Sequence, residues 1–313
     1  MHGIAGHHHI SMITKRAIPN NRFYQEILGL RRVKVTVNQD EPSMYHLFYG
    51  DKTGSPGTEL SFFEIPRVGR TYRGTNAITR IGLLVPSEES LLYWEERFDT
   101  HDVSHNGITT YAGHRALPFE DPEGLRLVLL LSNGQKVNHW ETWSKSDVPD
   151  HHQIQGMGSV EMTVRDLDAL AETLTGLFGY REVSRTDQEG VFQSVEGEVF
   201  GEIVAVKQDG PAEKSGRGSV HHLAIRVQND EALAYWEKRV REWGFQTAGI
   251  VDRYYFNSLY FKETNGIVFE IATDGPGFAI DGNEESLGKQ LDLPPFLEGR
   301  RKEIERKLTP FFE

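Results

Sequence analysis

Short apolar runs bounded by Gly, Asn and Asp recur along this chain, and they predict β-strands. Two of them frame residues 219–273: Ser-Val-His-His-Leu-Ala-Ile-Arg-Val at 219–227, and Asn-Gly-Ile-Val-Phe-Glu-Ile-Ala at 265–272. The N-terminal part also contains short apolar runs of this kind. A strand is expected from the histidines at 7–9 onward, then a helix at 20–28 and strands at 31–37, 44–49 and 59–65. The predicted order is therefore β-α-β-β-β.

The chain also repeats itself, which is the sign of a duplicated unit. The segment from Thr79 to Phe98 matches His221 to Val240, so that Tyr93-Trp94 corresponds to Tyr235-Trp236, 142 positions later. The same offset lays residues 119–124 on residues 261–266 without a gap. A second pair of copies matches residues 27–33 with 177–183 at an offset of 150.

These repeats divide the chain into four β-α-β-β-β modules and a tail. We expect them at the following residues: module one at 1–65, module two at 76–131, module three at 156–207, module four at 219–273, and the tail at 274–313. The tail contains a turn at 274–278 and a predicted charged helix at 298–307. Two interpretations of the tail stay open: a terminal helix packed on the scaffold, or a cover over a site, with Phe278 at its mouth.

Two residues in the fourth module suggest chemistry. His222 and Glu270 lie within apolar runs, where an unpaired carboxylate would be unfavourable by several kcal/mol. A metal ion would satisfy both, and a buried hydrogen bond between them is the alternative. The repeat favours the metal, since the second module has Arg80 and Val128 at these positions. The scaffold residues recur while the candidate ligands do not.

The first module supplies a third candidate ligand. His7, His8 and His9 could be the remnant of a purification tag, but Ile10, Met12 and Ile13 continue directly as a strand. The offset of 150 places His9 against Ser159 of the third module. His9, His222 and Glu270 thus give two imidazoles and one carboxylate, the facial set that holds non-haem Fe(II).

The composition limits which classes of protein and which partners are possible. The 313 residues are 38% hydrophobic and 26% charged, as in globular proteins, and no apolar run is long enough to cross a membrane. Cysteine is absent, which excludes disulfides and thiolate ligands. The formal charge of −12 argues against nucleic acid or an anionic membrane as a partner. Without an export signal, a cytoplasmic location is expected.

Taken together, these modules and residues resemble the vicinal oxygen chelate superfamily of glyoxalases and extradiol dioxygenases, and most closely the hydroquinone-type ring-cleaving dioxygenases. The likeness spans nearly the whole chain and rests on His8-His9-Ile, His221-His222, Arg253, Tyr260 and Glu270 in Gly-Ile-Val-Phe-Glu. It implies an α+β fold in which the modules pair into two half-barrel sheets. Because Ser159 cannot bind a metal and His9 can, modules one and four should form one pair, and modules two and three the metal-free pair.

The resemblance also implies roles for residues beside the three ligands. Arg253 would stabilise a phenolate or a developing oxyanion, and Tyr260 would hydrogen-bond the substrate oxygen. The alternatives are a surface charge paired with Asp252 and a core tyrosine. His8 and His221 precede the ligands, so strand alternation turns them away, and a supporting role at the site requires a twist or bulge.

The leading hypothesis is therefore an Fe(II)-dependent, non-haem dioxygenase in aromatic compound degradation, which opens hydroquinone- or catechol-like rings with O2. Mn(II) is an alternative metal, and Zn or Ni could replace iron during purification. The competing hypotheses are a glyoxalase-type metal-dependent lyase or isomerase, whose sites usually have two carboxylates, and a non-catalytic protein that binds a quinone or its adduct. The protein could be a dimer or a monomer.

Overall fold

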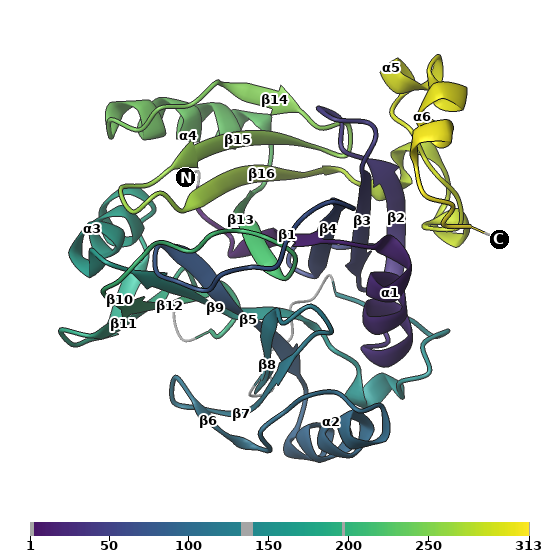
Figure 1. Ribbon diagram of the computed structural model, residues 1–313. Coiled ribbons are helices and arrows are strands. Elements are labelled where there is room, and N and C mark those ends of the chain that lie inside the picture. Colours follow the sequence, from purple (N-terminus) through teal and green to yellow (C-terminus); the bar gives the residue numbers. More distant parts are fainter. Residues whose placement is uncertain (1–2, 133–139, 196–197, 313) are drawn as a thin grey trace.

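The computed structural model describes residues 3–132, 140–195 and 198–312, so the first two positions of module one and the last of the tail lie outside it. In this described part the strands form two eight-stranded, curled half-barrel sheets, one above the other in Figure 1. Each module follows the predicted β-α-β-β-β order. The predicted pairing, one with four and two with three, is confirmed.

The first sheet combines modules four and one. Its two halves meet where β1 runs antiparallel to β13, and in each half the first strand of the module lies parallel to the last. In spatial order its strands are β14 (Ile250–Asp252), β15 (Phe256–Lys262), β16 (Val268–Pro276), β13 (Ser219–Val227), β1 (His7–Thr14), β4 (Glu59–Glu64), β3 (Tyr45–Gly50) and β2 (Arg31–Val37).

The second sheet repeats this arrangement with modules three and two. Here β9 and β5 form the antiparallel junction. In spatial order its strands are β10 (Arg181–Arg185), β11 (Glu189–Gln193), β12 (Glu202–Lys207), β9 (Gly156–Val164), β5 (Ala77–Val85), β8 (Arg126–Leu131), β7 (His114–Glu120) and β6 (Thr109–Tyr111). The duplication seen in the sequence is thus a duplication of sheet topology.

One helical segment follows the first strand of every module, and each packs an apolar stripe against a sheet. The bounds are α1 (Ala17–Asn21) continued by a π-helical turn η1 (Arg22–Ile27), α2 (Glu88–Thr100), α3 (Leu167–Glu172) continued by η3 (Thr173–Leu177), and α4 (Asp230–Glu242). In α2, Leu91, Trp94 and Phe98 are buried, and the residues 142 positions later are buried in α4. Repeated sequence therefore gives repeated packing.

The first helix starts earlier than predicted, at Ala17 rather than Asn20. The backbone N–H of Ala17 donates a hydrogen bond of 2.8 Å to Glu64 Oε1. Because this partner comes from β4, at the far end of the module, no local capping signal marks the start of the helix. The segment ends as expected, since Gly29 takes a positive φ of 69°.

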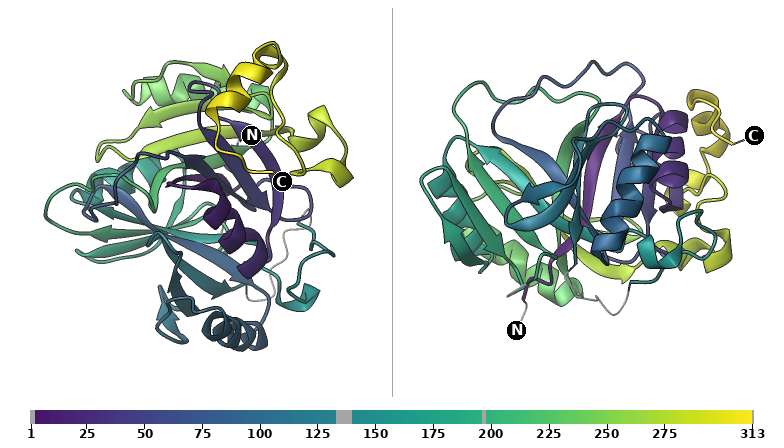
Figure 2. Two further views of the ribbon diagram at one scale, coloured as in Figure 1. Left: turned by 45° about the vertical axis from the view of Figure 1, so that its right-hand side comes forward. Right: turned by 90° about the horizontal axis from the view of Figure 1, so that it is seen from below.

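The tail packs on module one as part of the scaffold. Leu291 forms a parallel bridge with Val35 of β2, and Figures 1 and 2 show the C-terminal segment (yellow) beside β2. Its helices are α5 (Pro295–Glu298) and α6 (Arg301–Lys307), separated at Gly299, where a single helix was expected. Three short helical turns complete the chain: η2 (Asp150–His152), η4 (Phe278–Asp281) and η5 (Glu284–Ser286).

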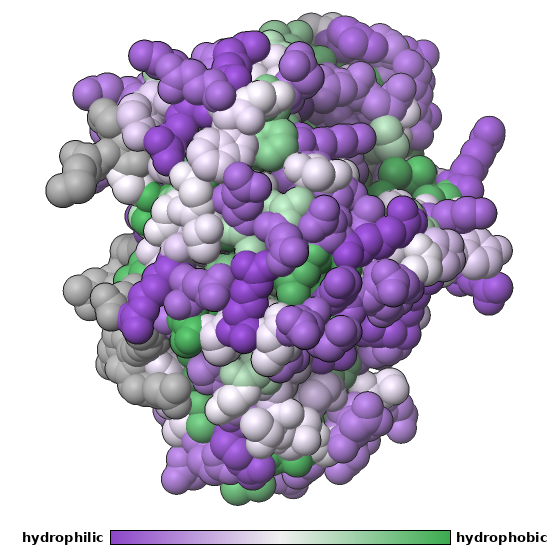
Figure 3. Space-filling model, turned by 90° about the vertical axis from the view of Figure 1, so that its left-hand side faces the viewer, coloured by the Kyte–Doolittle hydropathy of each residue, from purple (hydrophilic) through white to green (hydrophobic). Residues whose placement is uncertain are grey.

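The surface agrees with the formal charge of −12. The face drawn in Figure 3 is mostly hydrophilic, with apolar side chains in small, separate groups. Among the described residues, no helix combines the length and the apolar character that a membrane crossing requires.

Candidate metal centre

Three of the residues singled out in the sequence meet at the centre of the first sheet. His9 lies on β1, His222 on β13 and Glu270 on β16, which are neighbouring strands. Glu270 Oε2 is 2.8 Å from His222 Nε2 and 3.1 Å from His9 Nε2, and the two Nε2 atoms are 3.3 Å apart. All three side chains are buried. Ligand-type atoms from the first and fourth modules therefore converge on one point.

The state of the carboxylate suits a cation. Burial alone would raise the pKa of Glu270, but the positive charge that His9 and His222 carry when protonated holds it well below its usual 4.5, so the carboxylate is the group that stays ionised. The hydroxyl of Ser258 donates a hydrogen bond of 2.5 Å to Oε1. Oε2, which faces the two imidazoles, receives no hydrogen bond from the described residues. A buried anionic oxygen without a proton donor, beside two imidazole nitrogens, fits a divalent metal.

His8 fixes which nitrogen of His9 is free. The Nε2 atom of His8 lies 3.0 Å from the carbonyl oxygen of Thr273, which can only accept, so Nε2 carries the proton. The Nδ1 atom of His8 then accepts the hydrogen bond from Nδ1–H of His9, at 3.0 Å. His9 is left with a lone pair on Nε2, the atom that points to Glu270.

His221 contacts His222 as His8 contacts His9, through the two Nδ1 atoms. Their Nδ1 atoms are 2.7 Å apart, and Nε2 of His222 points to Glu270. Burial, as the largest cause, lowers the pKa of the His222 ring. Neutral rings at pH 7 provide the lone pairs that metal ligation needs.

Two β-bulges place these supporting histidines beside the ligands. In the pairing of β1 with β13, His7 is opposite Ile225 and His9 opposite Ala224, so His8 is the extra residue. Further along, Ser11 is opposite His222 and Met12 opposite Val220, so His221 is the extra residue on β13. The bulge that the sequence argument required is therefore present at both positions.

A second group of ligand-type side chains, His8, His9 and Glu59, also lies close together. Both nitrogens of His8 are already engaged, by His9 and by the Thr273 carbonyl. Burial raises the pKa of Glu59 well above 4.5, which keeps its carboxyl neutral. This group is therefore less suited to a metal than the first.

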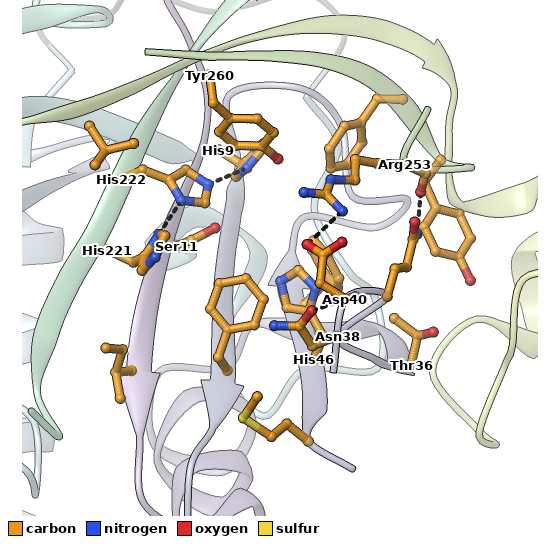
Figure 4. A pocket seen from close by; sticks show the side chains of 18 of the residues that line it. His9, Ser11, Thr36, Asn38, Asp40, His46, His221, His222, Arg253 and Tyr260 are labelled. Carbon is orange, nitrogen blue, oxygen red and sulfur yellow. Dashed lines mark hydrogen bonds and ion pairs between the residues drawn. The ribbon is translucent and has the colours of Figure 1, made fainter. Parts of the chain in front are cut away.

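A cavity of about 460 Å³ opens onto the site (Figure 4). This volume suits a small organic ligand. His9, His222 and Tyr260 line it close to Glu270, while Asn38, Asp40, Met44 and His46 come from module one. Its apolar walls include Ile13, Phe48, Phe63, Ile65, Phe256 and Val268.

Arg253 and Tyr260 both face this cavity. The guanidinium carbon of Arg253 is 5.3 Å from the centre of the Tyr260 ring. Its partner is Asp40, with Nη1 3.0 Å from Oδ2, as Figure 4 shows. The alternative pairing with Asp252 is wrong, because that carboxylate instead accepts from the backbone N–H of Tyr254. Burial is the main cause that raises the pKa of Tyr260, which keeps its hydroxyl protonated.

Phe278 does not line the cavity. Its ring is buried and packs against Phe48 and Tyr255, with centroids 4.9 Å and 5.3 Å away. The proposed cover over the mouth is therefore not seen, and Phe278 belongs to the packed scaffold.

Three residues of the site were missed in the sequence: Asp40, His46 and Ser258. One of them left a signal, because the offset of 142 that turns Glu270 into Val128 also turns Ser258 into Ala116. The carboxylate and its hydrogen-bond donor are absent together from the second module. His46 stands out only as one polar position in the apolar run Tyr-His-Leu-Phe-Tyr.

The second sheet has a different arrangement at the corresponding place. The guanidinium of Arg80 is 3.5 Å from Glu161 Oε2, which also accepts a hydrogen bond of 3.0 Å from the Tyr111 hydroxyl. Val128 belongs to a buried apolar cluster with Phe200. Within the described residues, both groups of potential metal ligands lie in modules one and four.

Comparison with known proteins agrees with this architecture. The model of the Glyoxalase/Bleomycin resistance protein/Dioxygenase superfamily matches residues 6–129 and 156–271. The chain is 48% identical over 313 residues to "Putative ring-cleaving dioxygenase MhqA" of Bacillus subtilis, covering 98% of this chain and 99% of that protein. It is 27% identical over 321 residues to the chlorohydroquinone/hydroquinone 1,2-dioxygenase of Sphingobium indicum, covering 98% and 96%.

A solved structure gives the same result for the whole chain. The crystal structure titled "putative dioxygenase from Bacillus subtilis" superposes with a TM-score of 0.92 at 32% identity, covering 100% of this chain and 99% of that one. The family model matches residues in all four modules, and the alignments cover nearly the whole chain. This chain therefore belongs to the Glyoxalase/Bleomycin resistance protein/Dioxygenase superfamily.

Proposed function

We propose that this protein is an Fe(II)-dependent dioxygenase that opens the ring of a hydroquinone- or catechol-like aromatic with O2. The observation that carries the proposal is the convergence of two imidazoles and one carboxylate at a cavity of about 460 Å³ with aromatic walls. Such a facial set is characteristic of non-haem iron oxygenases. The names of the relatives from Bacillus subtilis and Sphingobium indicum support the same class of reaction.

His9, His222 and Glu270 would hold the metal, with Mn(II) as an alternative and Zn or Ni as substitutes acquired in purification. When bound, ferrous iron supplies the redox chemistry that lets O2 react with an electron-rich ring. His8 keeps the imidazole of His9 in the tautomer that presents Nε2, and His221 lies against Nδ1 of His222. Ser258 holds the carboxylate through its other oxygen, which restrains the direction of Oε2.

The ring of the substrate would lie between the apolar walls, with one oxygen directed toward the three ligands. Tyr260 can donate a hydrogen bond to that oxygen, since burial raises its pKa and its hydroxyl stays protonated. Arg253 brings a positive charge to the same cavity and can stabilise negative charge that develops on a substrate oxygen. The walls also restrict water around the reacting ring.

A glyoxalase-type lyase is less well supported because of one position on β4. Glu270 pairs with Ala224 between β16 and β13, two residues after His222. In module one the matching pair is Ser61 with Ser11, two residues after His9. A second carboxylate would be expected where Ser61 stands. The candidate ligand set therefore has one carboxylate, as the dioxygenase hypothesis requires.

Oxygen uptake tests the proposal directly. The purified protein should be stripped of metal, loaded with Fe(II) without air, and mixed with O2 and a series of hydroquinones and catechols. We expect uptake with at least one member, coupled to loss of the aromatic absorbance. Glu270→Ala should abolish uptake, whereas Arg80→Ala in the second sheet should retain it. Binding of these aromatics without any oxygen uptake would contradict the proposal and favour a non-catalytic binding protein.

A further inference from the structure

His46 of β3 lines the same cavity at a distance from the candidate ligands. The strands lie in the order β13-β1-β4-β3, so two strand spacings, roughly 10 Å along the sheet before curvature, separate β3 from β1. Figure 4 shows the imidazole beside Asn38 and away from His9 and His222. The metal does not need His46, yet it lines the same cavity.

The ring packs against two aromatic side chains. Its centroid is 4.1 Å from that of Phe48, two residues along the same strand, and 4.2 Å from that of Phe63, its partner on β4. An imidazole in such an apolar setting is unfavourable unless its nitrogens find partners. These two contacts and the partner of one nitrogen therefore restrict how the ring can turn.

One nitrogen of His46 has a partner and the other does not. Nε2 lies 3.1 Å from the hydroxyl of Ser61, which lies 2.6 Å from the hydroxyl of Ser11. No described residue forms a hydrogen bond with Nδ1. Burial of the ring is the largest cause that keeps the pKa of His46 well below 6.5, so the ring is neutral at pH 7.

A neutral imidazole with one free nitrogen selects for a hydroxyl group. If Ser61 donates to Nε2, the proton is on Nδ1, which then donates to a ligand; if Nε2 donates to Ser61, Nδ1 accepts. A hydroxyl can respond in both cases because it donates and accepts. A methyl group or a hydrogen atom at this place would leave a polar nitrogen without a partner.

We propose that Nδ1 of His46 binds the second hydroxyl of the aromatic ligand, the one remote from His9, His222 and Glu270, and so selects 1,4-dihydroxybenzenes. The assignment rests on the proposed function, because it takes the first hydroxyl to be directed toward those three residues. A 1,4-diol carries its hydroxyls at opposite ends of the ring and reaches both sides of the cavity. A 1,2-diol has them on neighbouring carbons and reaches one.

The test measures binding without turnover. Dissociation constants for phenol, hydroquinone and catechol are determined by calorimetry, without air, on the Fe(II)-loaded protein. One neutral hydrogen bond predicts that hydroquinone binds about tenfold more tightly than phenol. His46→Phe should remove this preference while changing the dissociation constant of phenol less than about twofold. His46→Gln, which retains hydrogen-bonding groups, should keep part of it.

Met44→Leu is the matched control, since Met44 lines the cavity and offers no nitrogen or oxygen atom there. It should keep the full preference for hydroquinone. Equal binding of phenol and hydroquinone by the unaltered protein would overturn the inference, without recourse to any variant. A His46→Phe protein that retains the preference, or that loses affinity for both ligands equally, would also overturn the inference.

These outcomes are separable from those of the oxygen-uptake experiment. If hydroquinone is preferred through His46 but no oxygen is consumed, the proposed dioxygenase activity fails and the role of His46 stands. If oxygen is consumed but the preference is absent or independent of His46, the proposed role of His46 fails and the dioxygenase activity stands.

Discussion

The Nδ1 atoms of His8 and His9 lie 3.0 Å apart, although neighbouring residues of a strand ordinarily point to opposite faces. The bulge at His8 makes this contact possible, and a second bulge brings His221 to within 2.7 Å of His222. Both irregularities occur where β1 meets β13, at the junction of modules one and four. The junction thus provides each of the two candidate histidine ligands with a second imidazole against its Nδ1 atom.

His8→Leu should weaken metal binding while leaving all three candidate ligands in place. The change removes the acceptor for Nδ1–H of His9, so the ring is free to adopt the other tautomer. Loss of such a supporting partner lowers metal affinity about 10- to 100-fold. Competition with a chelator, using Zn(II) or Fe(II), gives the affinity. His114→Leu, a change to a partly buried histidine of the second sheet, should leave it unaltered. An unchanged affinity in His8→Leu would show that the Thr273–His8–His9 chain does not prepare the site.

Much of the fold could be predicted from the sequence because the chain is duplicated. The offsets of 142 and 150 set four modules side by side, and the missing histidine and carboxylate in two of them indicated which modules pair. Burial periodicity in α2 and α4 is local, so both helices could be anticipated. The start of α1 could not, because its cap is Glu64, which arrives from β4.

The surroundings of the site were harder to predict for a related reason. A bulge depends on the register of two strands that are more than 200 residues apart in sequence, as His9 and His222 are. Asp40 and His46 reach the cavity only because β2, β3 and the loop between them curl over the sheet. In sequence they resemble an ordinary turn acid and a lone strand histidine.

Ser258→Ala should reduce metal affinity without removing a ligand. Its hydroxyl donates 2.5 Å from Glu270 Oε1 and restrains the carboxylate whose other oxygen faces the imidazoles. Loss of a supporting hydrogen bond of this kind should lower affinity by about tenfold. Chelator competition measures the change, and Ala116→Ser at the matching place in module two is the control. If Ser258→Ala binds metal as the unaltered protein does, the carboxylate must be held by its backbone alone.

Lys34→Met should loosen the tail. Lys34 is 1% exposed, and its ammonium lies 2.7 Å from Asp281 and 2.8 Å from Asp292. Removing one member of a buried ionic group leaves the others unpaired, which destabilises a protein by about 3–5 kcal/mol. Urea unfolding should show this loss, and limited proteolysis should show earlier cleavage between the two aspartates.

Lys52→Met provides the comparison for that experiment. Lys52 also contacts two carboxylates, Glu141 at 2.8 Å and Glu284 at 3.3 Å, but its side chain is 37% exposed. Solvent screens such pairs, so its loss should hardly change the urea midpoint or the cleavage rate. Equal effects of the two changes would show that burial of Lys34 is not what fixes the tail.

Asp121→Asn should change how stability depends on pH. Asp121 is buried in the turn between β7 and β8, where Oδ1 accepts from the backbone N–H groups of Glu123 and Leu125 and Oδ2 accepts from the Tyr24 hydroxyl. Burial outweighs these hydrogen bonds and raises its pKa from 3.8 to about 6. The folded protein therefore retains a proton that the unfolded chain releases above pH 3.8.

The direction in which stability changes with pH follows from this difference in bound protons. Where the folded state binds more protons, stability falls as pH rises, so Asp121 favours folding below pH 3.8 and loses this contribution as pH passes through about 6. Asparagine does not titrate and can accept the same two backbone hydrogen bonds. The unfolding free energy of the variant minus that of the unaltered protein should therefore grow by roughly 2 kcal/mol between pH 4 and pH 7. Urea titrations of both proteins across this range measure the difference, and a difference independent of pH would show that Asp121 is already ionised in the folded protein at pH 4.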